Sequence, residues 1–263
     1  MGKYNSSEYR VKPLMRHLEK NPQDIKKLID FLTCGFDDLG DPIGYRYADI
    51  ENGKTEKGLK PTKAHLLGLV NYLSGKGAEK YSVSDDNRIK LLNADTETRE
   101  LAKSEIRKTY DSLPSRAWYL FEGYTYPDIF IEGEDYIIIC EGKWTEPNIT
   151  TETTYLKNAY GEYRNQMIRH IQGALNYNEN KKVYAFYIVD ENCSYIDSLT
   201  LNSFADHVEN ETITLGYNEK IEVLSSYCGC LFWQKIEDAL GIKFLSKEEI
   251  DASRPMYHNN PTA

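Results

Sequence analysis

The residues of this chain whose types and spacing suit chemistry best are Asp128, Glu141 and Lys143. Carboxylate oxygens are ligands that Mg²⁺ prefers, and a nearby ammonium group can orient a water molecule or offset developing negative charge. All three residues border strongly apolar runs, where charge is costly unless an ion or a substrate compensates it. The set therefore predicts a metal-assisted site, provided that the fold brings the three side chains together.

A β-hairpin is the element that would do so. Ile129–Ile131 and Tyr136–Cys140 are apolar runs, and the polar residues 132–135 between them include the glycine that a tight connection favours. Folding back about this loop brings Asp128, at the start of the first strand, beside the residues that end the second strand. The hairpin thus predicts that the two acidic residues meet at one end of a sheet.

At the end of the second strand an acidic and a basic residue, Glu141 and Lys143, lie two positions apart. Side chains two residues apart on a strand share a face, so Glu141 and Lys143 are expected to project together while Gly142 points away. One interpretation is a catalytic pair. The other is a salt-bridged pair at a strand end with no chemical role.

These residues carry a resemblance to a known family. Pro127-Asp128, twelve intervening residues and Glu141-Gly142-Lys143 resemble the PD-(D/E)XK nuclease superfamily. The longer string FEGYTYPD…EGKWTEP…TTYLKNAYGEYRNQMIRH is similar to a bacterial branch with the pattern FEG–PD–EGK–TE–Q–RH, and it covers roughly the middle third of the chain.

The resemblance implies a metal-dependent nuclease that hydrolyses phosphodiester bonds, with DNA as the expected substrate. Asp128, Glu141 and the backbone carbonyl of Gly142 would hold Mg²⁺ or Mn²⁺, and Lys143 would assist the attack on the phosphodiester. The implied fold is α/β: a restriction-endonuclease-like αβββαβ core, in which helices flank a central mixed sheet, with an N-terminal helical extension.

A helix predicted over residues 154–178 follows the lysine. Gln166, Arg169 and His170 lie on a polar stripe nearly opposite its apolar side. The resemblance implies that this helix faces the substrate, with Gln166 in a catalytic role and Arg169 and His170 in substrate binding. The alternative is that the stripe is merely solvated.

A further acid is expected near the site. Glu122 precedes Asp128 by six residues and could hold a second metal or orient a water molecule. It could equally be a turn residue before Gly123, and Glu105 on the preceding helix competes for the same role.

The rest of the chain divides into three parts. Residues 1–92 form a mainly helical region in which 35–60 read as loops, 93–252 form the nuclease-like domain, and 253–263 form a loose tail. Within the domain the pattern predicts helices at 95–113, 154–178, 199–207 and 231–240, with strands at 118–121, 129–131, 136–140, 183–189 and 221–224. The last of these strands is expected at an edge of the sheet.

Composition narrows the functional classes. A net charge of −9 argues against a general nucleic-acid coat, which would carry a basic excess, although a basic groove can coexist with it. The sequence contains no apolar run long enough to span a membrane, and its N-terminus lacks the apolar core of a signal peptide. A cytoplasmic location is therefore expected. Cys228 and Cys230 make a poor zinc site without a second pair.

The alternative function is a catalytically weak nucleic-acid-binding or interaction protein with a nuclease-like fold. Another hydrolase is disfavoured because the sequence contains no GxSxG or HExxH pattern. The oligomeric state cannot be read from the sequence.

Overall fold

The computed structural model of the 263-residue chain describes residues 4–33, 38–80, 84–112, 123–145, 165–210 and 215–253. Its centre is a five-stranded sheet in the order β1-β2-β3-β4-β5. β2 is antiparallel to both β1 and β3, whereas β3, β4 and β5 run parallel, so the sheet is mixed and the fold is α/β. The strands are β1 (Gly44–Arg46), β2 (Ile129–Glu132), β3 (Tyr136–Gly142), β4 (Lys182–Val189) and β5 (Tyr227–Phe232).

β2 and β3 form the hairpin that the sequence predicts. Ile129 pairs with Cys140, and the backbone N–H of Gly133 donates to the carbonyl of Tyr136 at 3.0 Å to close the connection. Every residue of β3 is buried, as a central strand covered on both faces requires. The prediction of the hairpin is confirmed, and so is the strand that the apolar run 183–189 predicts, which is β4.

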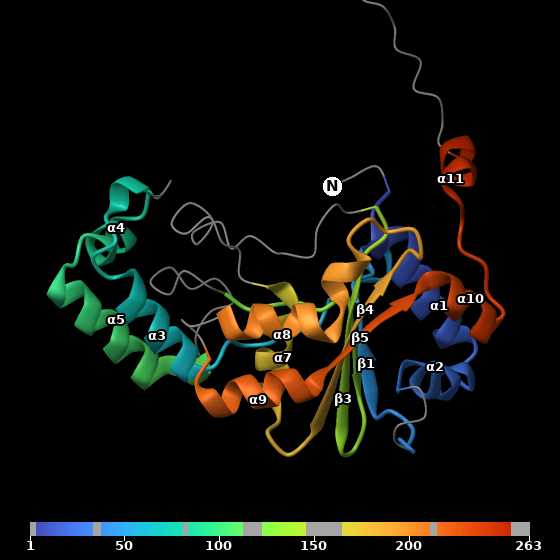
Figure 1. Ribbon diagram of the computed structural model, residues 1–263, viewed down its shortest axis with the longest axis horizontal. Coiled ribbons are helices and arrows are strands. Elements are labelled where there is room, and N and C mark those ends of the chain that lie inside the picture. Colours follow the sequence, from blue (N-terminus) through green and yellow to red (C-terminus); the bar gives the residue numbers. More distant parts are fainter. Residues whose placement is uncertain are drawn as a thin grey trace, which may run out of the picture.

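Helices cover both faces of the sheet (Figure 1). Side chains alternate between the faces: Ile138 and Cys140 belong to one core cluster, and Ile137 and Ile139 to the other. The helices of the first cluster are α1 (Lys12–Lys20), α2 (Asp24–Thr33) and α10 (Trp233–Leu240). Those of the second are α7 (Gln166–Tyr177), α8 (Leu201–Asn210) and α9 (Tyr217–Ser226).

A third group of helices lies at the left of Figure 1 and has its own apolar core. It consists of α3 (Lys63–Leu73), α4 (Asp86–Leu92) and α5 (Thr96–Thr109). The remaining helix, α11 (Lys247–Ser253), lies near the C-terminal end of the described chain, and short 3₁₀ turns occur at Ile50–Asn52, Ala78–Lys80, Tyr110–Ser112 and Ile196–Leu199. No helix in the described ranges is both long and apolar enough to cross a membrane.

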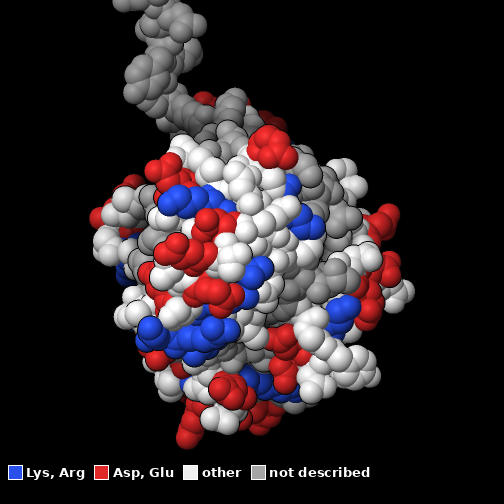
Figure 2. Space-filling model, turned by 90° about the vertical axis from the view of Figure 1, so that its left-hand side faces the viewer, with Lys and Arg blue, Asp and Glu red and all other residues white. Residues whose placement is uncertain are grey.

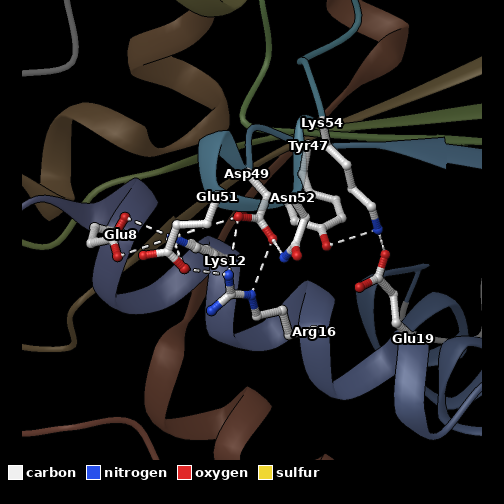
Figure 3. A network of polar contacts seen from close by, with 9 residues as sticks. All are labelled: Glu8, Lys12, Arg16, Glu19, Tyr47, Asp49, Glu51, Asn52 and Lys54. Atoms are coloured by element: carbon white, nitrogen blue, oxygen red, sulfur yellow. Dashed lines mark hydrogen bonds and ion pairs between the residues drawn. The ribbon is translucent and has the colours of Figure 1, made fainter.

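A network of charged side chains fastens α1 to the segment after β1 (Figure 3). The buried carboxylate of Asp49 accepts hydrogen bonds from Arg16 at 3.1 Å and from Asn52 at 2.6 Å. Arg16 also donates to Glu51 at 2.8 Å, and the Lys12 ammonium lies 3.6 Å from Asp49. Burial alone would raise the pKa of Asp49, but the bonds from Asn52 and Arg16 outweigh it and lower that pKa to about 2.

Two expectations about secondary structure are wrong. Residues 44–46 form β1 at the edge of the sheet rather than part of a loop, and three residues are too few for a period of two to show. The run Ile221–Leu224 lies in α9 rather than in a strand, and the edge of the sheet opposite β1 is formed by β5. Glu219 accepts a bond from the Gly216 N–H at 2.7 Å at the start of α9, which favours the helix.

The strand expected at 118–121 lies outside the described residues, as do 154–164 of the predicted long helix and nearly all of the tail. The division of the chain at residue 92 stays a prediction. Residues on its N-terminal side nevertheless supply β1 and part of the core against the sheet, including Leu14, Leu28 and Tyr47.

Candidate active site

Glu141 and Lys143 lie at the end of β3 and project to the same side, as their spacing predicts. The Lys143 ammonium donates to Oε1 of Glu141 at 2.7 Å, and the two side chains are 13% and 5% exposed. Gly142 faces the other way, because a Cβ atom there would lie 2.8 Å from the ring of Trp233. Trp233 also donates its indole N–H to the carbonyl of Lys143 at 2.9 Å, which fixes the backbone at the end of the strand.

Asp128 lies beside this strand end, where the hairpin should place it. Its Oδ2 accepts the backbone N–H of Gly142 at 2.9 Å, and its Oδ1 accepts the hydroxyl of Ser7 at 2.9 Å. Ser7 opens a π-helical turn, Ser7–Val11, that leads into α1. The N-terminal segment therefore holds one of the two acidic side chains of the site.

The backbone carbonyl of Gly142 is directed to the same side as Asp128. The Gly142 N–H points to Asp128, whereas the N–H of the next residue, Lys143, bonds across to Ile188 of β4 at 2.8 Å. In an extended strand the N–H and C=O of one residue point toward the same neighbouring strand. The carbonyl expected to serve as a metal ligand is thus on the side of the carboxylate.

Gln166 is the first residue of α7, and this helix begins at the site. Its Oε1 accepts a hydrogen bond from the Lys143 ammonium at 3.1 Å, so the lysine is held between Glu141 and Gln166. The start of α7 is fixed by Asn165, whose side chain accepts the backbone N–H groups of Met167 and Ile168. Five of the residues expected at the site thus come together: Asp128, Glu141, Gly142, Lys143 and Gln166.

His170 is buried, which corrects the expectation of an open polar stripe. Its Nε2 lies 3.1 Å from Oε2 of Glu141 and its Nδ1 lies 2.7 Å from the hydroxyl of Thr125, with the residue only 1% exposed. The stripe is covered because the segments around Leu59 and Thr125 pair above α7 and pack on Gly173. Arg169 is partly exposed, and its role in substrate binding stays a prediction, as does that of His170.

The proton on His170 can be placed from its neighbours. Burial lowers the pKa of His170, so the imidazole is neutral at pH 7. An ionised Glu141 can only accept, so Nε2 carries the proton and donates to it. Nδ1 must then accept the hydroxyl proton of Thr125. The result is a directional chain of hydrogen bonds from Thr125 through His170 to Glu141.

The two carboxylates have opposite electrostatic settings. Burial, and then the negative charge of Glu141, raise the pKa of Asp128 well above its ordinary value. Burial would raise the pKa of Glu141 too, but the Lys143 charge and the His170 hydrogen bond lower it to about 2. A pair of buried carboxylates in such proximity is a setting that an added cation would stabilise.

Sequence reasoning missed three residues at the site: Ser7, Thr125 and Glu56. Burial, and then the negative charge of Glu141, raise the pKa of Glu56, which places a third carboxylate within electrostatic reach of the site. Ser7 and Glu56 come from segments far from the hairpin in the sequence, so no spacing signal marks them. Thr125 lies three residues before Asp128, but its place above α7 depends on its pairing with the distant Leu59.

Two acids are expected from the sequence for this third place, Glu122 and Glu105. Glu122 lies outside the described residues. Glu105 is on α5, next to Ile106, which belongs to the core that α5 shares with α3 and α4.

The oxygen donors of the site can be set against the ligands that a hard cation requires. Within the described ranges no three or more His, Cys, Asp or Glu side chains are grouped so as to hold a metal ion. Mg²⁺ commonly uses only one or two carboxylates and completes its shell with water and substrate phosphate oxygens. Asp128, Glu141 and the Gly142 carbonyl fit that pattern.

Comparison of the chain with family models, with curated proteins and with solved structures finds no match.

Proposed function

We propose that this protein is a metal-dependent nuclease that hydrolyses phosphodiester bonds in DNA. The observation that carries the proposal is the buried cluster in which Lys143 bridges Glu141 and Gln166, with Asp128 one hydrogen bond away on Gly142. A salt bridge with no chemical role would need neither a second buried carboxylate beside it nor a helix that begins at the lysine. The resemblance of the hairpin to the PD-(D/E)XK pattern supports the same conclusion.

The strand arrangement is compatible with the finer fold assignment. β2 and β3 form an antiparallel hairpin, and α7 then crosses to β4, which pairs with β3 in parallel. This is the order expected of a restriction-endonuclease-like core, which we propose for the sheet and for α7.

Each residue of the cluster has a separate task in this proposal. Asp128, Glu141 and the Gly142 carbonyl would hold Mg²⁺ or Mn²⁺, and the bound ion would supply Lewis-acid polarisation of the scissile phosphate and activation of water. The Lys143 ammonium donates hydrogen bonds to the attacking water or to the phosphate oxygens and offsets negative charge in the transition state. Gln166 keeps this ammonium directed into the site.

For the buried His170 we propose a role through Glu141, in place of the substrate-binding role that the resemblance implies. By donating to Oε2 it leaves Oε1 facing Lys143 and fixes the rotation of the carboxylate. Residues that hydrogen-bond a ligating carboxylate in this way commonly set its orientation. His170 is therefore a positioning residue in the proposed reaction.

A second candidate function is a nucleic-acid-binding protein with little catalysis. It is favoured by the fact that all four carboxylate oxygens of Asp128 and Glu141 already accept a hydrogen bond within the protein. The face at the α3–α5 end shows acidic and basic side chains intermingled among its described residues (Figure 2), an arrangement that favours neither candidate.

An assay of metal binding and cleavage separates the two candidates. Asp128→Asn keeps the size of the side chain but removes the charge that a hard cation requires, so it should weaken Mn²⁺ binding and abolish cleavage. Lys143→Ala leaves both carboxylates, so it should bind Mn²⁺ while turnover falls. A folded wild-type protein that shows neither cleavage nor any response to Mg²⁺ or Mn²⁺ would support the second candidate.

A further inference from the structure

A short two-stranded ribbon lies above α7 and passes the candidate site. Leu59 and Thr125 exchange both backbone hydrogen bonds, at 2.8 and 2.9 Å, in an antiparallel bridge. The inner side of the ribbon rests on α7, because a Cβ atom at Gly173 would lie 2.7 Å from Cβ of Leu59 and 3.4 Å from the methyl group of Thr125. Thr125 is also the residue that donates to His170.

The outer side of the same ribbon is aromatic. Residues on either side of Thr125 in an extended segment project opposite to it, which places Tyr124 and Tyr126 outward. A Cβ atom at Gly58 would lie 2.9 Å from the Tyr126 ring and 3.1 Å from the Tyr124 ring. Both rings thus lie close to Gly58, and a larger residue there would displace them.

Tyr126 is the accessible member of the aromatic pair, and Tyr124 is partly exposed. Tyr126 is 41% exposed although Thr125 beside it is buried. The lysines of the partner segment have other contacts: the Lys57 ammonium lies over the rings of Phe130 and Tyr177, and the Lys60 ammonium donates to the carbonyls of Tyr110 and Asp111. The feature that suits a nucleic acid is therefore the exposed ring itself, since proteins stack unpaired bases on such rings.

The two tyrosines are linked to the proposed catalytic residues both through the chain and through hydrogen bonds. Tyr126 precedes Asp128 by two residues, and Thr125 connects through His170 to Glu141. A strand of nucleic acid with a phosphate at the carboxylates would therefore run over or next to this surface.

We propose that Tyr124 and Tyr126 form a stacking surface for unpaired bases of single-stranded DNA beside the scissile phosphate. This inference rests on the proposed function for the identity of the ligand and goes beyond it in the form of the substrate. Bases in a duplex are already stacked on their neighbours, so the surface favours single strands, ends or flipped nucleotides.

The test is equilibrium binding of a fluorescein-labelled oligothymidylate of 12 nucleotides, measured by anisotropy in EDTA so that no cleavage occurs. Tyr126→Leu should raise Kd by about 5- to 150-fold, since stacking contributes about 1–3 kcal/mol per base. Tyr126→Phe keeps the ring and should bind like the wild type. Tyr217→Leu removes a tyrosine that is 80% exposed on α9 and serves as the matched control.

An abasic oligomer of the same length supplies the matched ligand, because it keeps the phosphates and lacks the bases. Tyr126→Leu should bind this oligomer as the wild type does. If Tyr126→Leu weakened binding of the abasic oligomer or of a duplex as much as it weakened binding of the oligothymidylate, the stacking surface would be overturned. An unchanged Kd for the oligothymidylate, or a wild type that does not bind it at all, would overturn it too.

Cleavage of the same oligothymidylate by the wild type in Mg²⁺ is measured in parallel. If the wild type cleaves the oligothymidylate and Tyr126→Leu binds it with an unchanged Kd, only the stacking surface is refuted. A Tyr126-dependent Kd without any cleavage supports the surface and refutes only the nuclease.

Discussion

Replacing Thr125 by valine tests the hydrogen-bond chain that supports Glu141. The substitution keeps the branched shape and exchanges the hydroxyl for a methyl group, so Nδ1 of His170 loses the donor that lies 2.7 Å away. Thr125 is 6% and His170 1% exposed, so water cannot readily take its place. A buried polar atom left without a partner costs about 1–3 kcal/mol of folding free energy. At about 2–4 °C per kcal/mol for a chain of this size, Tm should fall by about 2–12 °C.

Thr125→Ser is the control, because serine keeps the donor and loses one methyl group, which costs about 0.8 kcal/mol. Urea denaturation of the wild type and both variants gives the comparison. ¹⁵N spectra of the imidazole should show an Nε2-protonated ring in the wild type. A valine variant as stable as the wild type, or a ring protonated on Nδ1, would refute the reasoning.

Two further predictions concern stability. The pKa of Asp49 is lowered from 3.8 to about 2 in the folded protein, so its stabilising contribution is present above about pH 4 and is lost as the pH falls toward 2. Urea denaturation of the wild type should therefore show a steeper loss of stability between pH 4 and pH 2 than Asp49→Asn shows, and equal slopes would contradict this. For Gly173→Ala, helix propensity alone predicts a gain of about 1 kcal/mol. The added Cβ atom would lie 2.7 Å from Cβ of Leu59, which predicts instead a net loss of about 1–3 kcal/mol in folding free energy. A variant more stable than the wild type would show that the segment around Leu59 moves aside at little cost.

The local parts of the site could be predicted from the sequence. The hairpin follows from two apolar runs about a polar turn, and the meeting of Glu141 with Lys143 follows from a period of two. Both depend only on residues close together in the chain, where strand geometry leaves few choices. The contact of Gln166 with Lys143 required the resemblance as well, because periodicity alone does not say which side of a helix meets a sheet end.

The non-local parts could not be predicted. His170 lies on the polar stripe of α7 and yet is buried, because the pairing of Leu59 with Thr125 covers that stripe. Nothing in the sequence near either residue marks this pairing. Ser7 reaches the site in the same way, through a tertiary contact of a distant segment, and Glu56 lies within electrostatic reach of Glu141.

Short apolar runs were ambiguous for a different reason. Ile221–Leu224 has the composition of a strand, but Val223 packs into the core from α9 while Ile221 is 51% exposed. One buried residue in four suits a helix surface as well as an edge strand, and the tertiary environment decides between them.

The most direct test of the proposed activity is the rate of Mg²⁺-dependent DNA cleavage by the wild type and by Lys143→Ala, with thermal unfolding confirming that both are folded. The proposal predicts cleavage by the wild type that EDTA abolishes, and a rate at least about a hundredfold lower for the variant, as expected when a group that stabilises transition-state charge is removed. Full turnover by a folded Lys143→Ala protein would contradict the mechanism, because Lys143 would then be only the salt-bridge partner of Glu141.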